Sequence, residues 1–339
     1  MTQAIALPRK IASRARAAVA VVPRRIKSSL SAGAWAHYEK RLNSSRAGRK
    51  FLQRCSVVRH PWEFVVRRSA AHRLGAVPDR VTIDLASGYA RFGPSDFAEL
   101  PGLLQLARDV YEDKRPRLGV PNPTAKKKEY LSEILNDADL RRYPEFVEFC
   151  LSPDVVRAVS RYLGTVPVLR RVGLQLSTPA DVNADSRLYH LDPEDFRQVK
   201  IFINVFDVTP SEGPFTFLPG HVSDAVLDGI ARSERAAGIR RDQFRRWNDE
   251  ELEPYARPSD RVELLGPAGT GAFVDTSRCM HFGSRIAPGS MRLVFYVQYM
   301  RYHFAYATDQ NVIQPPGGAT DVRLAQLLTA RRPGRTPYT

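Results

Sequence analysis

The sequence lacks long apolar runs, clustered cysteines and, near its beginning, acidic residues. No stretch approaches the roughly 18 uncharged apolar residues that cross a membrane, so no spanning helix is expected. The apolar run at residues 17–22 is short and has arginines on both sides, so no cleaved secretory signal is expected. The three cysteines are widely spaced, with neither zinc-ligand spacing nor a disulfide framework. These features favour a reducing, cytoplasmic setting.

The excess of positive charge is confined to the beginning of the chain. Residues 1–73 contain 17 lysines and arginines against two acidic residues, which equals the whole net charge of +15. The remainder is neutral and carries no specific nucleic-acid motif. We expect residues 1–32 to be a basic arm, either a solvated or organelle-directing leader or a segment that associates weakly with anionic surfaces, peripherally at a membrane.

Hydrophobic patterning divides the rest of the chain. Residues 34–73 predict a helical lead-in with aromatic anchors such as Phe51 and Trp62, and helical spacing follows at 94–113, beginning at Ser95 or Asp96, and in two short helices over 143–164. Short segments rich in β-branched and aromatic residues then predict mostly antiparallel strands at 166–177, 198–209, 213–220, 260–267, 270–277 and 291–300. We therefore predict a basic arm and lead-in at 1–73, a β domain at 74–308 with a helical insertion at 222–259, and a tail at 309–339.

The motif His190-Leu191-Asp192 places an imidazole and a carboxylate on the same face of an extended segment. Two histidines and one carboxylate form the facial triad of non-haem Fe(II) oxygenases, although such a pair also occurs as a surface hydrogen bond. The third ligand would be His221, His281 or His303, of which His281 ends one predicted strand.

Arg292 follows His281 by 11 residues and begins the last predicted strand. There it shares a face with Val294, Tyr296 and Gln298, and a buried arginine at this position forms a bidentate pair with a carboxylate. A 2-oxo acid that chelates iron and places its far carboxylate on Arg292 would use both histidines and Asp192 in one geometry.

Several segments of the second half together resemble a known family. They read YHLD, QVKIFINVFDVTPSEGPFTFLPGH and DTSRCMHFGSRIAPGSMRLVFYVQY, within about residues 165–305. In this order they look like the phytanoyl-CoA dioxygenase family of Fe(II)/2-oxoglutarate-dependent oxygenases. The resemblance implies an α+β, mainly β protein with a double-stranded β-helix (jelly-roll, cupin-like) core and flanking N-terminal helices. It also implies iron ligands His190, Asp192 and His281 and a 2-oxoglutarate anchor, Arg292. Phe202 stands where the family often has tryptophan.

The expected function is hydroxylation of an unactivated C–H bond of a small-molecule or lipid-like substrate by O₂, because a carboxylate at Asp192 favours hydroxylation over halogenation. Asn204 and Gln175 also point polar amides from strands and are candidates to bind 2-oxoglutarate, although a core amide is an equally good interpretation. Two alternatives stay open. One is a non-catalytic jelly-roll binding module whose basic arm does the work. The other is a metal-dependent cupin enzyme that does not use 2-oxoglutarate.

Overall fold

The protein is described by a computed structural model over residues 45–118, 130–180, 185–239, 245–302, 311, 313–315, 317 and 321–330. The basic arm at 1–32 and His303 lie outside the described residues. No helix in these ranges is long and apolar enough to cross a membrane.

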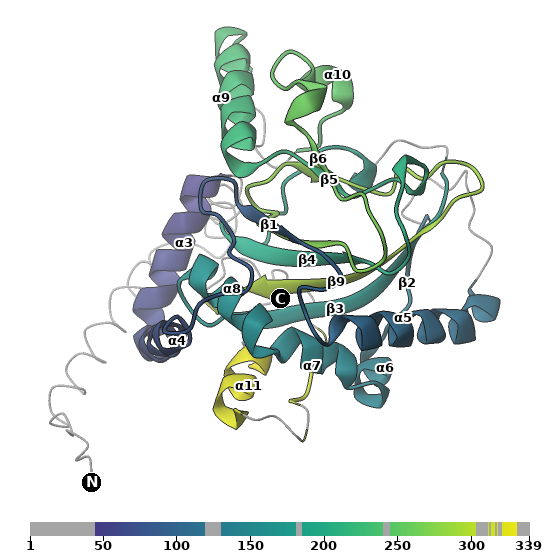
Figure 1. Ribbon diagram of the computed structural model, residues 1–339. Coiled ribbons are helices and arrows are strands. Elements are labelled where there is room, and N and C mark those ends of the chain that lie inside the picture. Colours follow the sequence, from purple (N-terminus) through teal and green to yellow (C-terminus); the bar gives the residue numbers. More distant parts are fainter. Residues whose placement is uncertain are drawn as a thin grey trace, which may run out of the picture.

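Two antiparallel sheets form the centre of the described structure (Figure 1). The large sheet has the order β1-β7-β4-β9-β3-β2, and the small sheet has the order β6-β5-β8. The strands of the large sheet are β1 Tyr89–Phe92, β2 Leu131–Glu133, β3 Val168–Ser177, β4 Gln198–Asn204, β7 Gly271–Val274 and β9 Arg292–Met300. Those of the small sheet are β5 Thr216–Phe217, β6 Val262–Glu263 and β8 His281–Phe282.

From β3 onward the chain alternates between the two sheets. After β3 in the large sheet, His190 pairs with His281 of β8 in the small sheet, and β4 then returns to the large sheet. The chain continues through β5 and β6 in the small sheet, β7 in the large, β8 in the small and β9 in the large. This winding is that of a double-stranded β-helix, so the jelly-roll prediction is confirmed.

Alternation along the strands separates the two faces of the large sheet. In β4, Val199, Ile201 and Ile203 join the main hydrophobic core. Lys200 and Phe202 therefore point to the opposite face, toward the small sheet. The space between the sheets thus receives charged and aromatic side chains, whereas the outer face of the large sheet receives aliphatic ones.

Helices α5 Leu100–Lys114, α7 Glu145–Leu151 and α8 Pro153–Leu163 cover the outer face of the large sheet, with the short α6 Asp137–Arg142 beside them (Figure 1). The two helices predicted over 143–164 are confirmed, and the second ends at Gly164 with φ of 72°. The predicted helix start at Ser95 or Asp96 is wrong, because the Asp96 carboxylate accepts the Gly93 N–H at 2.7 Å and stabilises a turn instead.

Helices α9 Gly220–Ala236 and α10 Asp249–Leu252 lie on the outer side of the small sheet (Figure 1). Val226 and Ile230 of α9 and Leu252 of α10 pack with Leu218 and Met280 in a separate hydrophobic cluster. The predicted insertion therefore includes two helices, and it also contributes Trp247, whose backbone pairs with Tyr189.

The helices nearest the ends of the described chain pack on this same body. They are α3 Arg46–Arg59, α4 Pro61–Leu74 and α11 Val322–Thr329, and Ala70 and Leu328 share a cluster with Val156 of α8. Phe51 and Trp62 are 55% and 71% exposed, so the prediction that they anchor the lead-in is wrong. Helices α3 and α4 turn small and polar residues inward instead. The division of the chain at residues 73 and 308 stays a prediction.

Candidate metal centre

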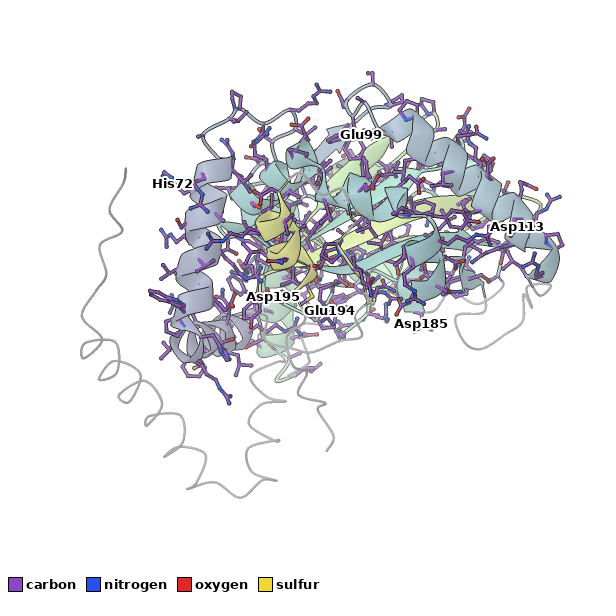
Figure 2. The ribbon with its side chains drawn as sticks, turned by 90° about the horizontal axis from the view of Figure 1, so that it is seen from below. His72, Glu99, Asp113, Asp185, Glu194 and Asp195 are labelled. Atoms are coloured by element: carbon purple, nitrogen blue, oxygen red, sulfur yellow. The ribbon has the colours of Figure 1, made fainter. Side chains whose placement is uncertain are left out.

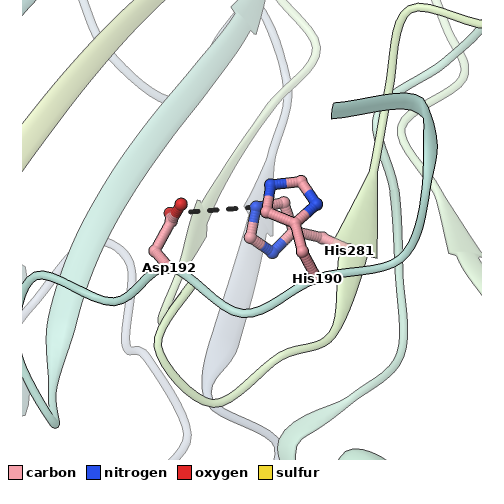
Figure 3. A group of neighbouring side chains, drawn as sticks. All are labelled: His190, Asp192 and His281. Carbon is pink, nitrogen blue, oxygen red and sulfur yellow. Dashed lines mark ion pairs between the residues drawn. The ribbon is translucent and has the colours of Figure 1, made fainter. Parts of the chain in front are cut away.

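The predicted motif and the predicted distal histidine meet at one edge of the small sheet. The backbone N–H groups of His190 and His281 each donate to the other residue's carbonyl at 3.0 Å. The Asp192 N–H donates to the Thr276 carbonyl at 2.9 Å, which fixes the carboxylate two residues beyond His190. Figure 3 shows the Asp192 carboxylate directed toward the imidazoles.

The backbone sets the orientation of both imidazoles. His190 Nδ1 lies 2.9 Å from the Leu188 carbonyl, and His281 Nδ1 lies 2.9 Å from the Cys279 carbonyl. Because a carbonyl only accepts, each Nδ1 carries a proton and each Nε2 keeps its lone pair. His190, Asp192 and His281 each offer a ligand atom, all within 4.8 Å of one another. His281 Nε2 is 3.8 Å from Asp192 Oδ2.

The protonation states suit a divalent cation. Burial lowers the pKa of His281 and lowers that of His190 well below its ordinary value, so both rings are neutral at neutral pH. Burial alone would raise the pKa of Asp192, but the ammonium of Lys200 together with His281 and His190 outweighs burial, and the pKa lies below its usual range. Two neutral imidazoles and one carboxylate are the donor set that a metal requires. The three residues therefore fit a metal ion.

Lys200 is a member of this centre that the sequence analysis did not identify. Its Nζ lies 2.7 Å from Asp192 Oδ2, and the two side chains are 17% and 9% exposed. Burial lowers the pKa of Lys200, but the negative charges of Asp192 and Glu194 together outweigh burial and leave the pKa above its ordinary value. The sequence of β4 contains the signal, because Lys200 stands between the buried apolar residues Val199 and Ile201.

Arg292 is buried between the sheets beyond the histidines. Its guanidinium donates to the Gly213 carbonyl, and its Nη2 donates to Ser284 Oγ at 3.4 Å. Ser284 is held by Ser177 at 2.9 Å and adopts a φ of 61°. No carboxylate of the described residues forms an ion pair with Arg292, and burial lowers its pKa to about 10. An arginine buried in this way is suited to a bound carboxylate.

Bulk at residue 283 would crowd this arginine. A Cβ on Gly283 would lie 3.0 Å from Arg292 Nη2. Gly283 follows His281 by two residues, so the short segment after β8 connects the imidazole to the arginine's surroundings. The side chains of His281 and Arg292, which were predicted to act together, therefore both point into the space between the two sheets.

The remaining predicted residues have different positions. Asn204 Nδ2 donates to the Leu264 carbonyl at 3.0 Å, so its amide joins β4 to the segment after β6. Gln175 is half-buried in β3 opposite Val294. Their contacts with 2-oxoglutarate stay predictions. His221, one of the three alternatives for the third ligand, is exposed at the beginning of α9.

Aromatic rings form one wall beside the histidines. Phe202 and Phe215 stack at 3.9 Å between ring centroids with 21° between their planes, and Phe215 lies 5.5 Å from the ring of His281. Phe202 belongs to the large sheet, whereas Phe215 precedes β5 of the small sheet. The stack therefore spans the two sheets and places apolar surface beside the ring of His281.

Comparison with protein-family models finds no match, and comparison with curated proteins finds none either. Among solved structures, the epimerase SnoN in complex with Fe3+, alpha ketoglutarate and nogalamycin RO is 18% identical with a TM-score of 0.43, covering 75% of this chain and 93% of its own. The carbocyclase SnoK is 19% identical with a TM-score of 0.40, covering 64% and 80%. HygX from Streptomyces hygroscopicus, with nickel and 2-oxoglutarate bound, is 14% identical with a TM-score of 0.40, covering 64% and 84%. Likenesses this distant leave the chemistry of the chain to be inferred from its own site.

Proposed function

We propose that the protein is an Fe(II)- and 2-oxoglutarate-dependent dioxygenase that hydroxylates an unactivated C–H bond of a small-molecule or lipid-like substrate. The observation that carries this proposal is the convergence of His190, Asp192 and His281 inside a double-stranded β-helix that also buries Arg292 without an acidic partner among the described residues. This class of reaction needs a metal with open coordination positions. It also needs a buried positive charge that binds the far carboxylate of 2-oxoglutarate.

Each of the four site residues has a defined task in this proposal. His190 and His281 present Nε2, and Asp192 presents a carboxylate oxygen, as the three ligands of the iron. Arg292 holds the far carboxylate of 2-oxoglutarate and so orients the co-substrate. When bound, the iron supplies activation of O₂ together with 2-oxoglutarate.

The aromatic wall and the carboxylate ligand bear on the type of reaction. Phe202 and Phe215 keep water away from the reacting atoms, which suits abstraction of hydrogen from an unreactive carbon. Asp192 occupies the ligand position that a halogenating site leaves open for halide, so we favour hydroxylation. Analysis of the product by mass spectrometry tests this point, because an oxygen atom from O₂ would be retained in it.

The proposal is tested by metal and co-substrate binding. Anaerobic calorimetry with Fe(II) followed by 2-oxoglutarate should show one site for each, and slow succinate release should appear in air. His281→Ala should lose metal binding, whereas the matched control His221→Ala, at an exposed histidine, should retain it. Arg292→Met should retain the metal and bind 2-oxoglutarate at least about tenfold more weakly, whereas exposed Arg91→Met should not.

The same experiment separates the alternatives. Metal binding with no effect of 2-oxoglutarate would favour a cupin enzyme with another co-substrate. Absence of metal binding would favour a non-catalytic jelly-roll module. Full turnover by His281→Ala would show that the assignment of the ligands is wrong.

We also propose that the basic arm at residues 1–32 associates weakly with anionic surfaces. Its charge supports this, as does the exposure of Phe51, Trp62 and Val65 on the helices α3 and α4 that follow. Removing residues 1–32 should weaken sedimentation with acidic vesicles, and added salt should weaken it in the full-length protein. Equal vesicle binding by both proteins at low salt would contradict the proposal.

A further inference from the structure

Arg246 stands beside the metal ligands in a cross-strand row. The backbones of Tyr189 and Trp247 exchange two hydrogen bonds of 2.9 Å in an antiparallel bridge. The residue after Tyr189 and the residue before Trp247 are therefore opposite each other, and opposite side chains share a face. His190 is paired on its other side with His281. The row across the small sheet is thus Arg246, His190 and His281.

The charge of Arg246 is not balanced by an acid among the described residues. Four neighbouring arginines on this side of the fold are in ion pairs: Arg245 with Glu234 and Glu251, Arg261 and Arg285 with Asp249, and Arg278 with Asp224. Arg246 instead donates from Nη1 to the backbone carbonyl of Asp185 at 2.6 Å (Asp185 is labelled in Figure 2). This contact fixes the side chain and leaves other guanidinium N–H groups available.

The electrostatics of the histidines agree with this position. Burial is the main cause of the low pKa of His190 and of His281, and the positive charge of Arg246 adds to it for both rings. Arg246 is half-buried, so its charge is screened less than that of a surface arginine.

We propose that Arg246 binds an anionic group, a carboxylate or a phosphate, of the substrate beside the metal centre. This inference rests on the proposed function and assigns the substrate class, which is an acid whose reacting carbon lies near its charged group. The arginine supplies planar, paired N–H donors that match either anion.

Arg246 and Arg292 serve different anions. Arg292 lies beyond His281 and is bound by Gly213 and Ser284, whereas Arg246 is at the other end of the row, beyond His190. A single 2-oxoglutarate that uses Arg292 for its far carboxylate leaves Arg246 available for a second molecule. Arg292 therefore binds the co-substrate, and Arg246 binds the substrate.

The test measures anion binding to the nickel-loaded protein saturated with 2-oxoglutarate. Inorganic phosphate and benzoate are titrated separately by calorimetry, so that the two chemistries are distinguished. Wild type should bind one of them, and Arg246→Met should bind it at least about tenfold more weakly, as expected for a hydrogen-bonded charge pair. Arg246→Lys should fall between the two, and it serves as the second variant if the methionine protein does not fold.

The matched control is Arg245→Met, which removes the same charge one residue away. Arg245 lies over the Trp247 ring and pairs with Glu234 and Glu251, so its loss should leave anion binding at the wild-type value. Failure of the wild type to bind either anion, or equal binding by Arg246→Met, would overturn this inference alone. Failure to bind nickel or 2-oxoglutarate in the preceding steps would overturn the proposed function as well.

Discussion

Replacement of Lys200 by methionine should destabilise the metal-free protein more than the metal-bound protein. Lys200 Nζ and Asp192 Oδ2 are 2.7 Å apart, and both side chains are largely buried. At an effective dielectric constant of about 20, the attraction at this distance is about 6 kcal/mol, and the desolvation of both groups offsets much of it. Methionine keeps the length of the side chain but leaves the Asp192 carboxylate buried without its cation.

Breaking such a pair costs about 3–5 kcal/mol, because the remaining charge is uncompensated. We expect Lys200→Met to lower the free energy of unfolding of the metal-free protein by that amount at pH 7, as measured by urea denaturation. The loss should shrink as pH falls below about 4, where the unfolded carboxyl takes up a proton, and it should vanish only below the depressed pKa of Asp192 in the folded wild type. A divalent cation restores a positive charge to Asp192. The rise in melting temperature on addition of Ni²⁺ should therefore be larger for the variant than for the wild type.

The matched control is Lys114→Met. Lys114 forms a partly buried ion pair with Asp139 between α5 and α6, with no histidine ligand in that pair. It should lose stability, and nickel should not recover the loss. The reasoning is refuted if nickel raises the melting temperature of Lys200→Met no more than that of the wild type, or if the metal-free variant is as stable as the wild type at pH 7.

Three further predictions concern the interior of the fold. A Cβ at Gly173 would lie 2.4 Å from the Tyr296 ring and from Glu133, so Gly173→Ala should cost about 1–3 kcal/mol in urea unfolding, and an unchanged midpoint would contradict this. Burial raises the pKa of Glu133 to about 7, so this group should lower the stability of the wild type as pH rises from about 4 to 7, where the unfolded carboxyl ionises before the folded one. Glu133→Gln should remove about 1–2 kcal/mol of that fall, a figure reduced for partial exposure; parallel pH profiles would count against it. Tyr299→Phe removes a buried hydrogen bond of 2.7 Å to the Cys150 carbonyl and should cost about 1–2 kcal/mol, detectable as a lower melting temperature.

The sequence predicted which residues of the candidate centre lie together better than it predicted the residues around them. The pair His190 and Asp192 is a local pattern, whereas spacing left His221, His281 and His303 open as the third ligand, and the family resemblance selected His281 together with Arg292. Lys200 was missed because its partner is eight residues away and only the folded chain brings them together. The same holds for the other atoms around Arg292, which come from Gly213 and Ser284.

The fold class was predictable, but the element boundaries were not. The β-branched segments indicated an antiparallel double sheet, and the structure confirms it. The short strands β2 and β8 have too few residues to show a period, and the helix predicted to start at Ser95 begins five residues later because a side chain–backbone hydrogen bond makes a turn there. The exposed positions of Phe51 and Trp62 depend on tertiary packing, which composition does not determine.

The pairing of Trp247 with Tyr189 makes the insertion a structural neighbour of the segment that carries His190. It covers the otherwise open backbone of the segment that carries His190, and so protects that edge from pairing with another chain. Exchange of this insertion between related proteins would change the side chains beside His190 while His190, Asp192 and His281 stayed in place. Under the proposed function, chimaeras that swap residues 222–259 should therefore change substrate preference while metal binding is retained.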